Sequence, residues 1–225
     1  MQPFKVADKE HPDPARFIRD NTDVQAPRLL SELRLHLASE MMPLWHATED
    51  ELADRGIPPP YWAFAWAGGQ ALTRFVLDNP AYVRGRRVLD FAAGSGMGAV
   101  GAMRAGAATA TATDLDPFAC AAVAINAEAN DVAVTVERRD VIGIMDGPWD
   151  LVMAGDVCYE EPMAGRVGAW LIELAEAGMP VLMGDPGRAY RPTHGLERLA
   201  RYQVQTTVEL EDSDLRSASV WRVGG

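Results

Sequence analysis

The sequence predicts one α/β domain built on a mixed sheet of seven strands, the last of which runs antiparallel. Between residues 87 and 183, short apolar or β-branched runs alternate with helical segments, as they do in the βαβ units of parallel sheets. The chain then ends on two strand-like runs joined by one turn, and such a hairpin is antiparallel. A length of 225 residues suits a single domain with a core of its own.

The N-terminal part contains turn signals and short helices rather than a regular alternation. Asp13-Pro14 is typical of an N-cap followed by proline at the first helical position, which predicts a helix to Asn21. The sequence TEDE at residues 48–51 fits a capping box and predicts a second helix that runs to Gly56. We therefore expect a helical extension over this part of the chain.

The chain divides at residue 60 in this interpretation: residues 1–60 form an N-terminal extension packed over the cleft, and residues 61–225 form the α/β domain. The spacing of apolar residues, the prolines and the glycines set the expected elements. Helices are expected at Gly69–Asp78, Met97–Arg104, Pro117–Ala129, Met163–Ala177 and Leu196–Ala200, and strands at Arg87–Phe91, Thr109–Thr113, Val132–Val136, Asp150–Ala154, Val181–Met183, Tyr202–Leu210 and Leu215–Val223.

Charge and composition exclude several classes of function. With 21 basic and 32 acidic residues the formal net charge is −11, which works against nucleic acid as a partner. Cys120 and Cys158 cannot form a disulfide framework, and the four histidines lack the spacing of a zinc site, so no metal is expected. The sequence has neither an apolar stretch of about 18 residues nor an N-terminal targeting pattern. We expect a monomeric cytoplasmic protein without membrane association.

The most informative segment is VLDFAAGSGMG at residues 88–98, in which a strand leads into a glycine-rich turn and a helix follows directly. Glycines allow a ligand to approach the backbone closely, and the start of a helix offers free N–H groups. This combination predicts a loop that binds a nucleotide cofactor. It does not fit a P-loop, because the chain contains no Gly-Lys dipeptide, nor a nucleophile elbow, because Ala93 and Met97 stand where glycines are required.

Two frames of this loop point to different cofactors. Gly96-x-Gly98-x-x-Gly101 matches the dinucleotide fingerprint, and an acidic residue follows 18 positions later, as for NAD. The frame Asp90-x-x-x-Gly94-x-Gly96 fits better, because an acid within the strand is unfavourable beside a pyrophosphate. It suits S-adenosylmethionine, which carries an ammonium group and no phosphate. Ala92 and Ser95 belong to the same loop and are expected to line the cofactor with its glycines.

Acidic residues follow two further strands, and ligands of open α/β sheets bind at the carboxyl ends of the strands. Asp114 is placed to accept from both ribose hydroxyls, and Leu115 to cover one face of the adenine. Asp140 is placed to accept from the adenine amino group, with Val141 beside it. Each acid alone also fits a strand-end or N-cap residue, but acids after three consecutive strands favour the cofactor interpretation.

The end of the fourth strand carries Asp156-x-x-Tyr159. Enzymes that methylate amide or adenine nitrogens usually carry Asn/Asp-Pro-Pro-Tyr/Phe at this place, and this chain does not. A carboxylate suits an amine that arrives as a cation, because it orients the nitrogen and stabilises positive charge. The alternative is structural: Asp156 caps a helix and Tyr159 packs in the core.

With these motifs, the chain resembles the seven-stranded, Rossmann-like S-adenosylmethionine-dependent methyltransferases, in the branch of protein-lysine methyltransferases with Asp-x-x-Tyr. Within that branch it is most similar to the electron transfer flavoprotein β-subunit lysine methyltransferases, over roughly residues 24–223. The motifs that carry the resemblance are PYWAFAWAGGQAL at 60–72, LDNP at 77–80, DLDP at 114–117, WDLV at 149–152 and GDPGR at 184–188.

The resemblance implies roles for residues that spacing alone does not assign. Trp66 and Gly69 would line the cofactor, while Asp156 and Tyr159 would face the target lysine as catalytic residues. Trp62, Arg188 and Tyr190 would contact the substrate. In one departure from the family, Ala67 stands where Trp-Pro-Gly-Gly has proline. In another, the substrate-facing N-terminal segment matches only in part.

The function that follows is transfer of a methyl group from S-adenosylmethionine to a lysine side chain of a protein, with the electron transfer flavoprotein β-subunit as the expected partner. An alternative is a methyltransferase for a small amine or pyridine, whose signature would be a closed, lidded pocket. An NAD-binding Rossmann protein and a non-catalytic scaffold are the remaining alternatives.

Overall fold

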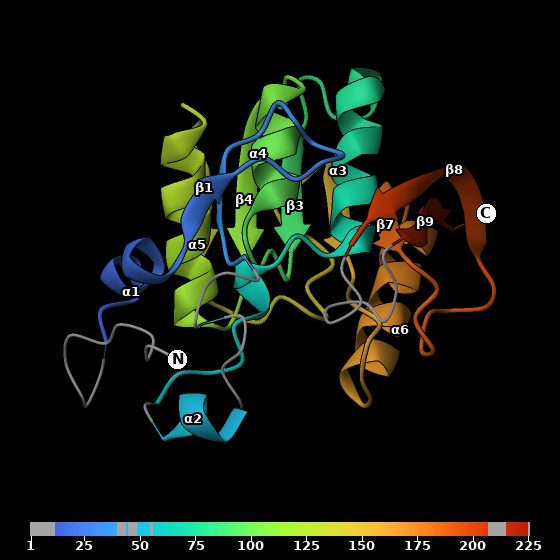
Figure 1. The fold of residues 1–225 in the computed structure, drawn as a ribbon. Coiled ribbons are helices and arrows are strands. Elements are labelled where there is room, and N and C mark those ends of the chain that lie inside the picture. The colour runs from blue at the N-terminus through green and yellow to red at the C-terminus, as the bar shows by residue number, and fades with distance from the viewer. Residues whose placement is uncertain (1–11, 40–43, 45–48, 55, 207–214, 225) are drawn as a thin grey trace.

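A computed structural model describes residues 12–39, 44, 49–54, 56–206 and 215–224 (Figure 1). Its main sheet has seven strands in the order β5-β4-β3-β6-β7-β9-β8. The first five strands in this order run parallel to one another, and β9 runs antiparallel to both β7 and β8. The predicted mixed sheet with an antiparallel last strand is confirmed. The strands are β3 (Arg87–Phe91), β4 (Thr109–Thr113), β5 (Thr135–Glu137), β6 (Leu151–Gly155), β7 (Val181–Asp185), β8 (Leu196–Gln205) and β9 (Leu215–Val223).

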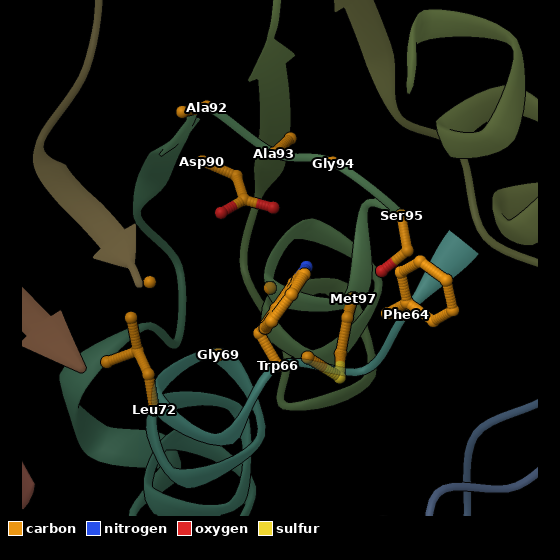
Figure 2. A pocket seen from close by; sticks show the side chains of 12 residues that line it. Phe64, Trp66, Gly69, Leu72, Asp90, Ala92, Ala93, Gly94, Ser95 and Met97 are labelled. Atoms are coloured by element: carbon orange, nitrogen blue, oxygen red, sulfur yellow. The ribbon is translucent and has the colours of Figure 1, made fainter. Parts of the chain in front are cut away.

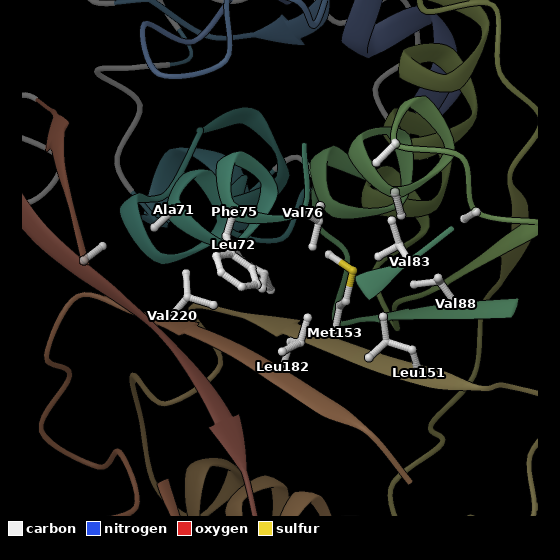
Figure 3. Close-up of a cluster of buried hydrophobic side chains, with 14 of the residues drawn as sticks. Ala71, Leu72, Phe75, Val76, Val83, Val88, Leu151, Met153, Leu182 and Val220 are labelled. Atoms are coloured by element: carbon white, nitrogen blue, oxygen red, sulfur yellow. The ribbon is translucent and has the colours of Figure 1, made fainter. Parts of the chain in front are cut away.

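Helices cover both faces of the sheet. α3 (Ala67–Asp78), α4 (Met97–Arg104) and α5 (Pro117–Ala129) lie on one face, and α6 (Met163–Glu176) lies on the other. Alternate residues of a strand therefore enter different cores: Val88 packs in the core on the side of α3 and α4 (Figure 3), whereas Leu89 packs on the α6 side. Because each central strand is buried on both faces, it consists of an apolar run rather than an alternating one.

The N-terminal part contains a short hairpin that the sequence did not predict. α1 (Pro14–Asn21) is confirmed, and the Asp13 side chain accepts from the Ala15 N–H as its cap (3.3 Å). β1 (Asp23–Gln25) and β2 (Leu35–Leu37) then pair antiparallel, and α5 fixes the second of them: the Asn126 side chain accepts from the His36 N–H at 2.7 Å. Asn126 also donates to the Ser95 carbonyl, so the same side chain joins the hairpin to the glycine loop.

Several boundaries differ from the expectation; β5, for example, begins at Thr135 rather than at Val132. The predicted helix at Leu196–Ala200 is wrong: the segment belongs to β8, which pairs with β9 through a bulge between Arg198 and Ala200. The second predicted helix is present as α2 (Glu49–Ala53), shorter than expected, and the Thr48 of its capping box lies outside the described residues. The turn at 207–214, with the end of the predicted strand Tyr202–Leu210, also lies outside them. Two 3₁₀ turns, η2 (Tyr61–Ala63) and η3 (Pro80–Tyr82), flank α3.

Gly165 offers a test of the helix assignment of α6. It is exposed, and a Cβ built there would meet only the carboxylate of Glu161, at 3.1 Å. Because glycine in an exposed helix costs about 0.5–1 kcal/mol relative to alanine, Gly165→Ala should raise the free energy of unfolding by about that amount. Urea denaturation followed by circular dichroism measures this, and a loss of stability would contradict the helical geometry at this position.

Candidate active site

A pocket opens where the strand order reverses. From β3 the chain proceeds outward through β4 and β5, and it then returns to β6 and β7 on the other side, so ligands are expected between the carboxyl ends of β3 and β6. Figure 2 shows the pocket at this place, with the aromatic side chains of the segment before α3 across from the glycine loop. The residues that line it are Phe64, Trp66, Gly69, Leu72, Asp90, Ala92, Ala93, Gly94, Ser95, Met97, Gly98 and Gly155.

The glycine loop leaves β3 through left-handed backbone. Ala92, Gly94 and Gly96 have φ values of 50°, 52° and 75°. A positive φ is readily adopted by glycine but is strained for alanine, and strain of this kind gathers at functional sites. The Asp114 carboxylate holds the turn in place by accepting from the Gly94 N–H at 2.9 Å and from the Asp116 N–H at 3.0 Å.

Asp90 is a buried acid in the pocket wall. Its carboxylate accepts from the Ala99 N–H at 2.7 Å, in the first turn of α4. Only glycine fits at position 98, since a Cβ there would lie 2.5 Å from Asp90 Oδ1. Burial raises the pKa of Asp90 to about 7, and the nearby charge of Asp114 adds to the rise. A cationic ligand group beside this carboxylate would stabilise its ionised form.

The residues expected around the adenine and ribose lie outside the lining of this pocket. Leu115, after β4, is 63% exposed, so its side chain is accessible to the face of a planar ligand. Asp140 accepts from the Ile142 N–H at 2.9 Å and forms an ion pair with Arg166 at 3.3 Å. The Val141 side chain is fully buried in the core on the α6 side, so only its backbone remains for a ligand. The cofactor contact of Val141 therefore remains a prediction that concerns its backbone.

Asp156 lies at the end of β6 and is tied to the start of α3. Its φ is 58°, a strained value for a residue other than glycine, and its side chain is almost fully buried. One carboxylate oxygen, Oδ2, accepts from the N–H groups of Gly68 and Gly69, the latter at 3.3 Å. The backbone N–H of Asp156 donates to the Gly184 carbonyl at 2.9 Å. The carboxylate therefore caps the N-terminus of α3, where a negative charge is favourable.

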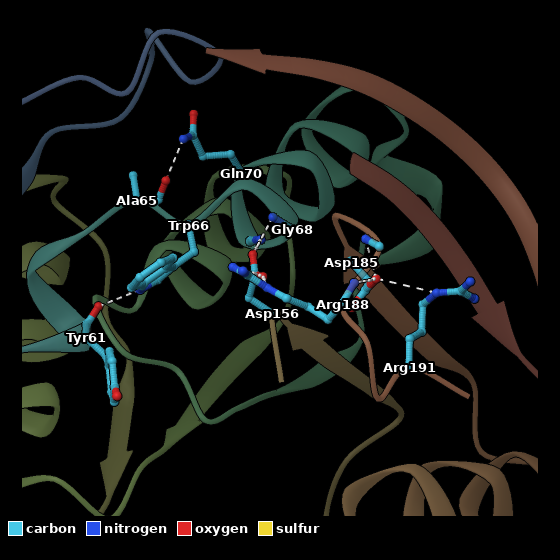
Figure 4. A network of polar contacts seen from close by, with 11 residues as sticks. Tyr61, Ala65, Trp66, Gly68, Gln70, Asp156, Asp185, Arg188 and Arg191 are labelled. Carbon is cyan, nitrogen blue, oxygen red and sulfur yellow. Dashed lines mark hydrogen bonds and ion pairs between the residues drawn. The ribbon is translucent and has the colours of Figure 1, made fainter. Parts of the chain in front are cut away.

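The other oxygen of Asp156 holds a cation. Arg188 places both Nε and Nη2 at 2.9 Å from Oδ1, and its guanidinium lies over the Trp66 ring, 5.6 Å from the centroid (Figure 4). Burial raises the pKa of Asp156, and the positive charge of Arg188 opposes that rise. The buried Asp156 carboxylate and the face of the Trp66 ring together form a binding site for a cation, which we call the cation seat.

Three aromatic residues were predicted to face the substrate, Trp62, Tyr159 and Tyr190, and their environments differ. Tyr159 is partly exposed, with its ring 5.7 Å from that of Tyr61, and Tyr190 is exposed. Burial raises the pKa of Tyr159 to about 12, so its hydroxyl keeps its proton at neutral pH and cannot serve as a base. Trp62 is buried and stacks on Phe118 at 6.4 Å, so the prediction that its side chain contacts the substrate is corrected.

Several residues of the site were not foreseen. Phe64, Leu72 and Met97 line the pocket, but in the sequence they belong to ordinary apolar helix or turn patterns. Gly155 also lines it, and the dipeptide Gly-Asp occurs at the end of both β6 and β7. That repetition is a signal the sequence offers for this part of the site.

Comparisons with known proteins identify the family. Residues 71–155 match the family of ribosomal protein L11 methyltransferase (PrmA). Over 214 residues the chain is 38% identical to the electron transfer flavoprotein beta subunit lysine methyltransferase of Xenopus laevis, with 92% of this chain and 86% of that protein covered. The human protein of the same name is 34% identical, with 93% and 82% covered. The chain belongs to this lysine methyltransferase family.

Solved structures support the fold of this methyltransferase. The ribosomal protein L11 methylase of Lactobacillus delbrueckii subsp. bulgaricus superposes with a TM-score of 0.54 at 17% identity, and the match covers 90% of this chain and 100% of that one. The methyltransferase SMU.776, solved with SAH, gives a TM-score of 0.53 at 12% identity, with 85% and 53% covered. At these identities the likeness concerns the fold.

S-adenosylmethionine is the cofactor of this methyltransferase, and the residues of the pocket fit it. Among the described residues, the lining contains one carboxylate, Asp90, and no lysine or arginine, which suits an ammonium group and disfavours a pyrophosphate. Gly94 and Ser95 bring the backbone to the pocket, Gly96 continues the same loop just outside the lining, and Asp114 and Leu115 follow the next strand. The NAD alternative is therefore set aside.

The pKa of Asp90 predicts how cofactor affinity changes with pH. A proton on Asp90 must be released before the carboxylate can pair with the ammonium group, so the affinity for S-adenosylhomocysteine should rise as the pH increases through about 7. Asp90→Asn should weaken binding about ten- to a hundredfold at mildly alkaline pH, because a charged hydrogen bond worth about 1.5–3 kcal/mol is lost, and should flatten the pH dependence. Calorimetry on both proteins measures this. A wild-type affinity that is constant between pH 6 and 8 would refute the pairing.

Proposed function

We propose that this chain transfers a methyl group from S-adenosylmethionine to a lysine side chain of the electron transfer flavoprotein β-subunit. The observation that carries the proposal is the seat formed by Asp156 and Trp66, which holds a cationic side chain at the edge of the cofactor pocket. The named relatives, which match over most of both chains, support the choice of protein substrate. When bound, S-adenosylmethionine supplies an electrophilic methyl group.

The residues of this site bind and orient the substrate amine. A lysine side chain has a pKa of about 10.4 in water, so only about one in a thousand is neutral at pH 7. Asp156 attracts the charged form and fixes the nitrogen at the pocket wall, and alignment of this kind supplies much of the acceleration in bimolecular reactions. The nitrogen loses its proton to solvent before it attacks, and the methylated product is a cation that the Asp156 carboxylate again stabilises.

The surroundings favour a protein substrate over a small one. Tyr159, whose ring packs against Tyr61 next to Trp66, and Tyr190, two residues after Arg188, are both partly exposed, so a larger molecule has access to them. A formal net charge of −11 steers a basic protein surface toward this enzyme, which acts on the rate of encounter more than on affinity. Methylation keeps the charge of lysine, so the product differs from the substrate in bulk and hydrogen bonding.

The test incubates the enzyme with tritiated S-adenosylmethionine and purified electron transfer flavoprotein. Label should appear in the β-subunit and disappear when its acceptor lysines, located by mass spectrometry, are replaced by arginine. Label confined to small molecules in a bacterial lysate would support the small-amine alternative and refute the proposal. Denatured flavoprotein serves as the control for recognition of a folded surface.

Localisation, oligomeric state and domain organisation complete the proposal. None of the helices in the described part of the chain is long and apolar enough to cross a bilayer. We propose a monomeric cytoplasmic protein that does not bind nucleic acid, with a domain boundary near residue 60. Gel filtration with light scattering tests the monomer, and limited proteolysis near residue 60 tests the boundary.

A further inference from the structure

Arg188 occupies the place that the proposed function gives to the substrate. Its guanidinium lies between the Asp156 carboxylate and the Trp66 ring, the two groups that form the cation seat beside the cofactor pocket. We propose that Arg188 is an internal stand-in for the target lysine, which fills the amine subsite of the free enzyme and is displaced by the substrate cation. This inference rests on the proposed function and assigns a gating and specificity role to one residue of that site.

Asp156 does not depend on Arg188 for its position. The oxygen Oδ2 is held by the N–H groups of Gly68 and Gly69, and the backbone N–H of Asp156 is bonded to Gly184. The guanidinium contacts the other oxygen, Oδ1. When Arg188 leaves, the carboxylate therefore stays in place with one oxygen available, as binding of a second cation requires.

The backbone that carries Arg188 is also anchored independently. Asp185, at the end of β7, accepts from the N–H groups of Gly187 at 2.7 Å and Arg188 at 3.0 Å, and Gly187 makes the turn with a φ of 92°. The guanidinium can thus leave its seat by side-chain rotation while the loop keeps its shape. The Arg188 side chain is 19% exposed, so a path to solvent exists.

Displacement of Arg188 by a substrate cation would make the enzyme specific for protonated amines. An uncompensated carboxylate inside a protein is costly, whereas a lysine ammonium that replaces the guanidinium keeps the charge balanced. A neutral side chain cannot compensate the charge and leaves Arg188 in its seat. The enzyme would thus select amines that arrive protonated, and the Asp156 carboxylate would not be exposed to water between turnovers.

The first test measures binding of n-butylammonium, a mimic of the lysine side chain, to the enzyme loaded with S-adenosylhomocysteine at mildly alkaline pH. Arg188→Gln should bind it at least tenfold more tightly than the wild type, because no internal cation has to be displaced. The matched control is Arg191→Gln, since Arg191 pairs with Asp185 at 3.5 Å and lies over Trp221 rather than at the seat. It should leave the affinity unchanged.

Equal or weaker binding of n-butylammonium to Arg188→Gln would overturn the proposal, as would a tenfold gain in Arg191→Gln. Neutral n-butanol should not distinguish the three proteins, which separates charge exchange from a wider pocket. Retained affinity for S-adenosylhomocysteine shows that the variants are folded.

A second measurement uses the wild type alone. The Nε–H signal of Arg188, assigned by its loss in Arg188→Gln, should exchange slowly with solvent in the free enzyme and rapidly when n-butylammonium saturates the site. Persistence of the slow signal at saturation would overturn the displacement. Failure of the proposed function would instead appear as absence of methyl transfer to the flavoprotein by the wild type, so the two failures are distinguishable.

Discussion

Asp156→Asn should lower turnover on the flavoprotein at least a hundredfold and change the affinity for S-adenosylhomocysteine by less than about threefold. Asparagine keeps an acceptor for the Gly68 N–H but loses the charge that attracts the substrate amine. Loss of one group that stabilises charge in a transition state typically costs about 10²–10³ in turnover. Because Asp156 lies beside the pocket rather than in its lining, the cofactor should be little affected.

Initial rates at saturating cofactor, with calorimetry of S-adenosylhomocysteine binding, measure both quantities. Turnover should fall more than the apparent affinity for the protein substrate, since the contact matters most during transfer. The alanine variant is a poorer test because it also removes the cap of α3, worth about 1 kcal/mol, and leaves Arg188 without its carboxylate. If Asp156→Asn kept more than a third of wild-type turnover, the structural interpretation of Asp156 as a helix cap would be the right one.

The sequence predicts the central fold well because its local signals agree with its packing. β3, α4, β4 and α5 begin and end at the predicted residues. At α5, for example, Asp116 caps the helix by accepting from the Phe118 N–H at 2.8 Å, and proline occupies the first helical position. Each of these elements is long enough for its apolar pattern to be unambiguous.

The sequence-based predictions fail where an element is short, or where one apolar pattern fits both a helix and a strand. β1 and β2 have three residues each, too few for an alternating pattern. β2 and the residue before it are held by Asn126 of α5 and by Asn130 just after that helix, which are remote in sequence. At Leu196–Ala200 the apolar residues stand at helical spacing, but pairing with β9 decides the conformation. Tertiary contacts override local preference in both cases.

The candidate site was predicted in its parts but not in its arrangement. Asp156, Trp66 and Arg188 were each assigned a role at the site, yet no spacing rule indicates that the arginine would lie between the other two. The three residues come from separate segments: residue 66 precedes α3, residue 156 follows β6 and residue 188 follows β7. Likewise, the sequence shows Trp62 among aromatic residues but not that its ring faces the core. Sequence patterns place residues on elements, and side-chain partners across elements come from the fold.

Two glycines support the start of α3, and substitution of one of them should lower the stability of the protein strongly. Gly155 of β6 and Gly184 of β7 are paired neighbours, and the helix N-terminus lies directly on them. A Cβ at Gly184 would overlap the Gly68 carbonyl oxygen and lie 2.7 Å from the Leu72 Cβ. Because backbone cannot move aside as a flexible side chain can, Gly184→Ala should displace α3 from the sheet and lower the free energy of unfolding by about 3 kcal/mol.

The same displacement should damage the active site, although Gly184 is not among the residues that line the pocket. The first turn of α3 contains Gly68 and Gly69, which hold Asp156, and Trp66 directly precedes the helix and lines both the pocket and the cation seat. We therefore expect at least a tenfold loss of both cofactor affinity and turnover, measured at a temperature where the variant remains folded. Gly165→Ala is the matched control, since it makes the same substitution on an exposed helix face and should leave activity unchanged. Wild-type stability and activity in Gly184→Ala would mean that α3 does not rest on these two glycines.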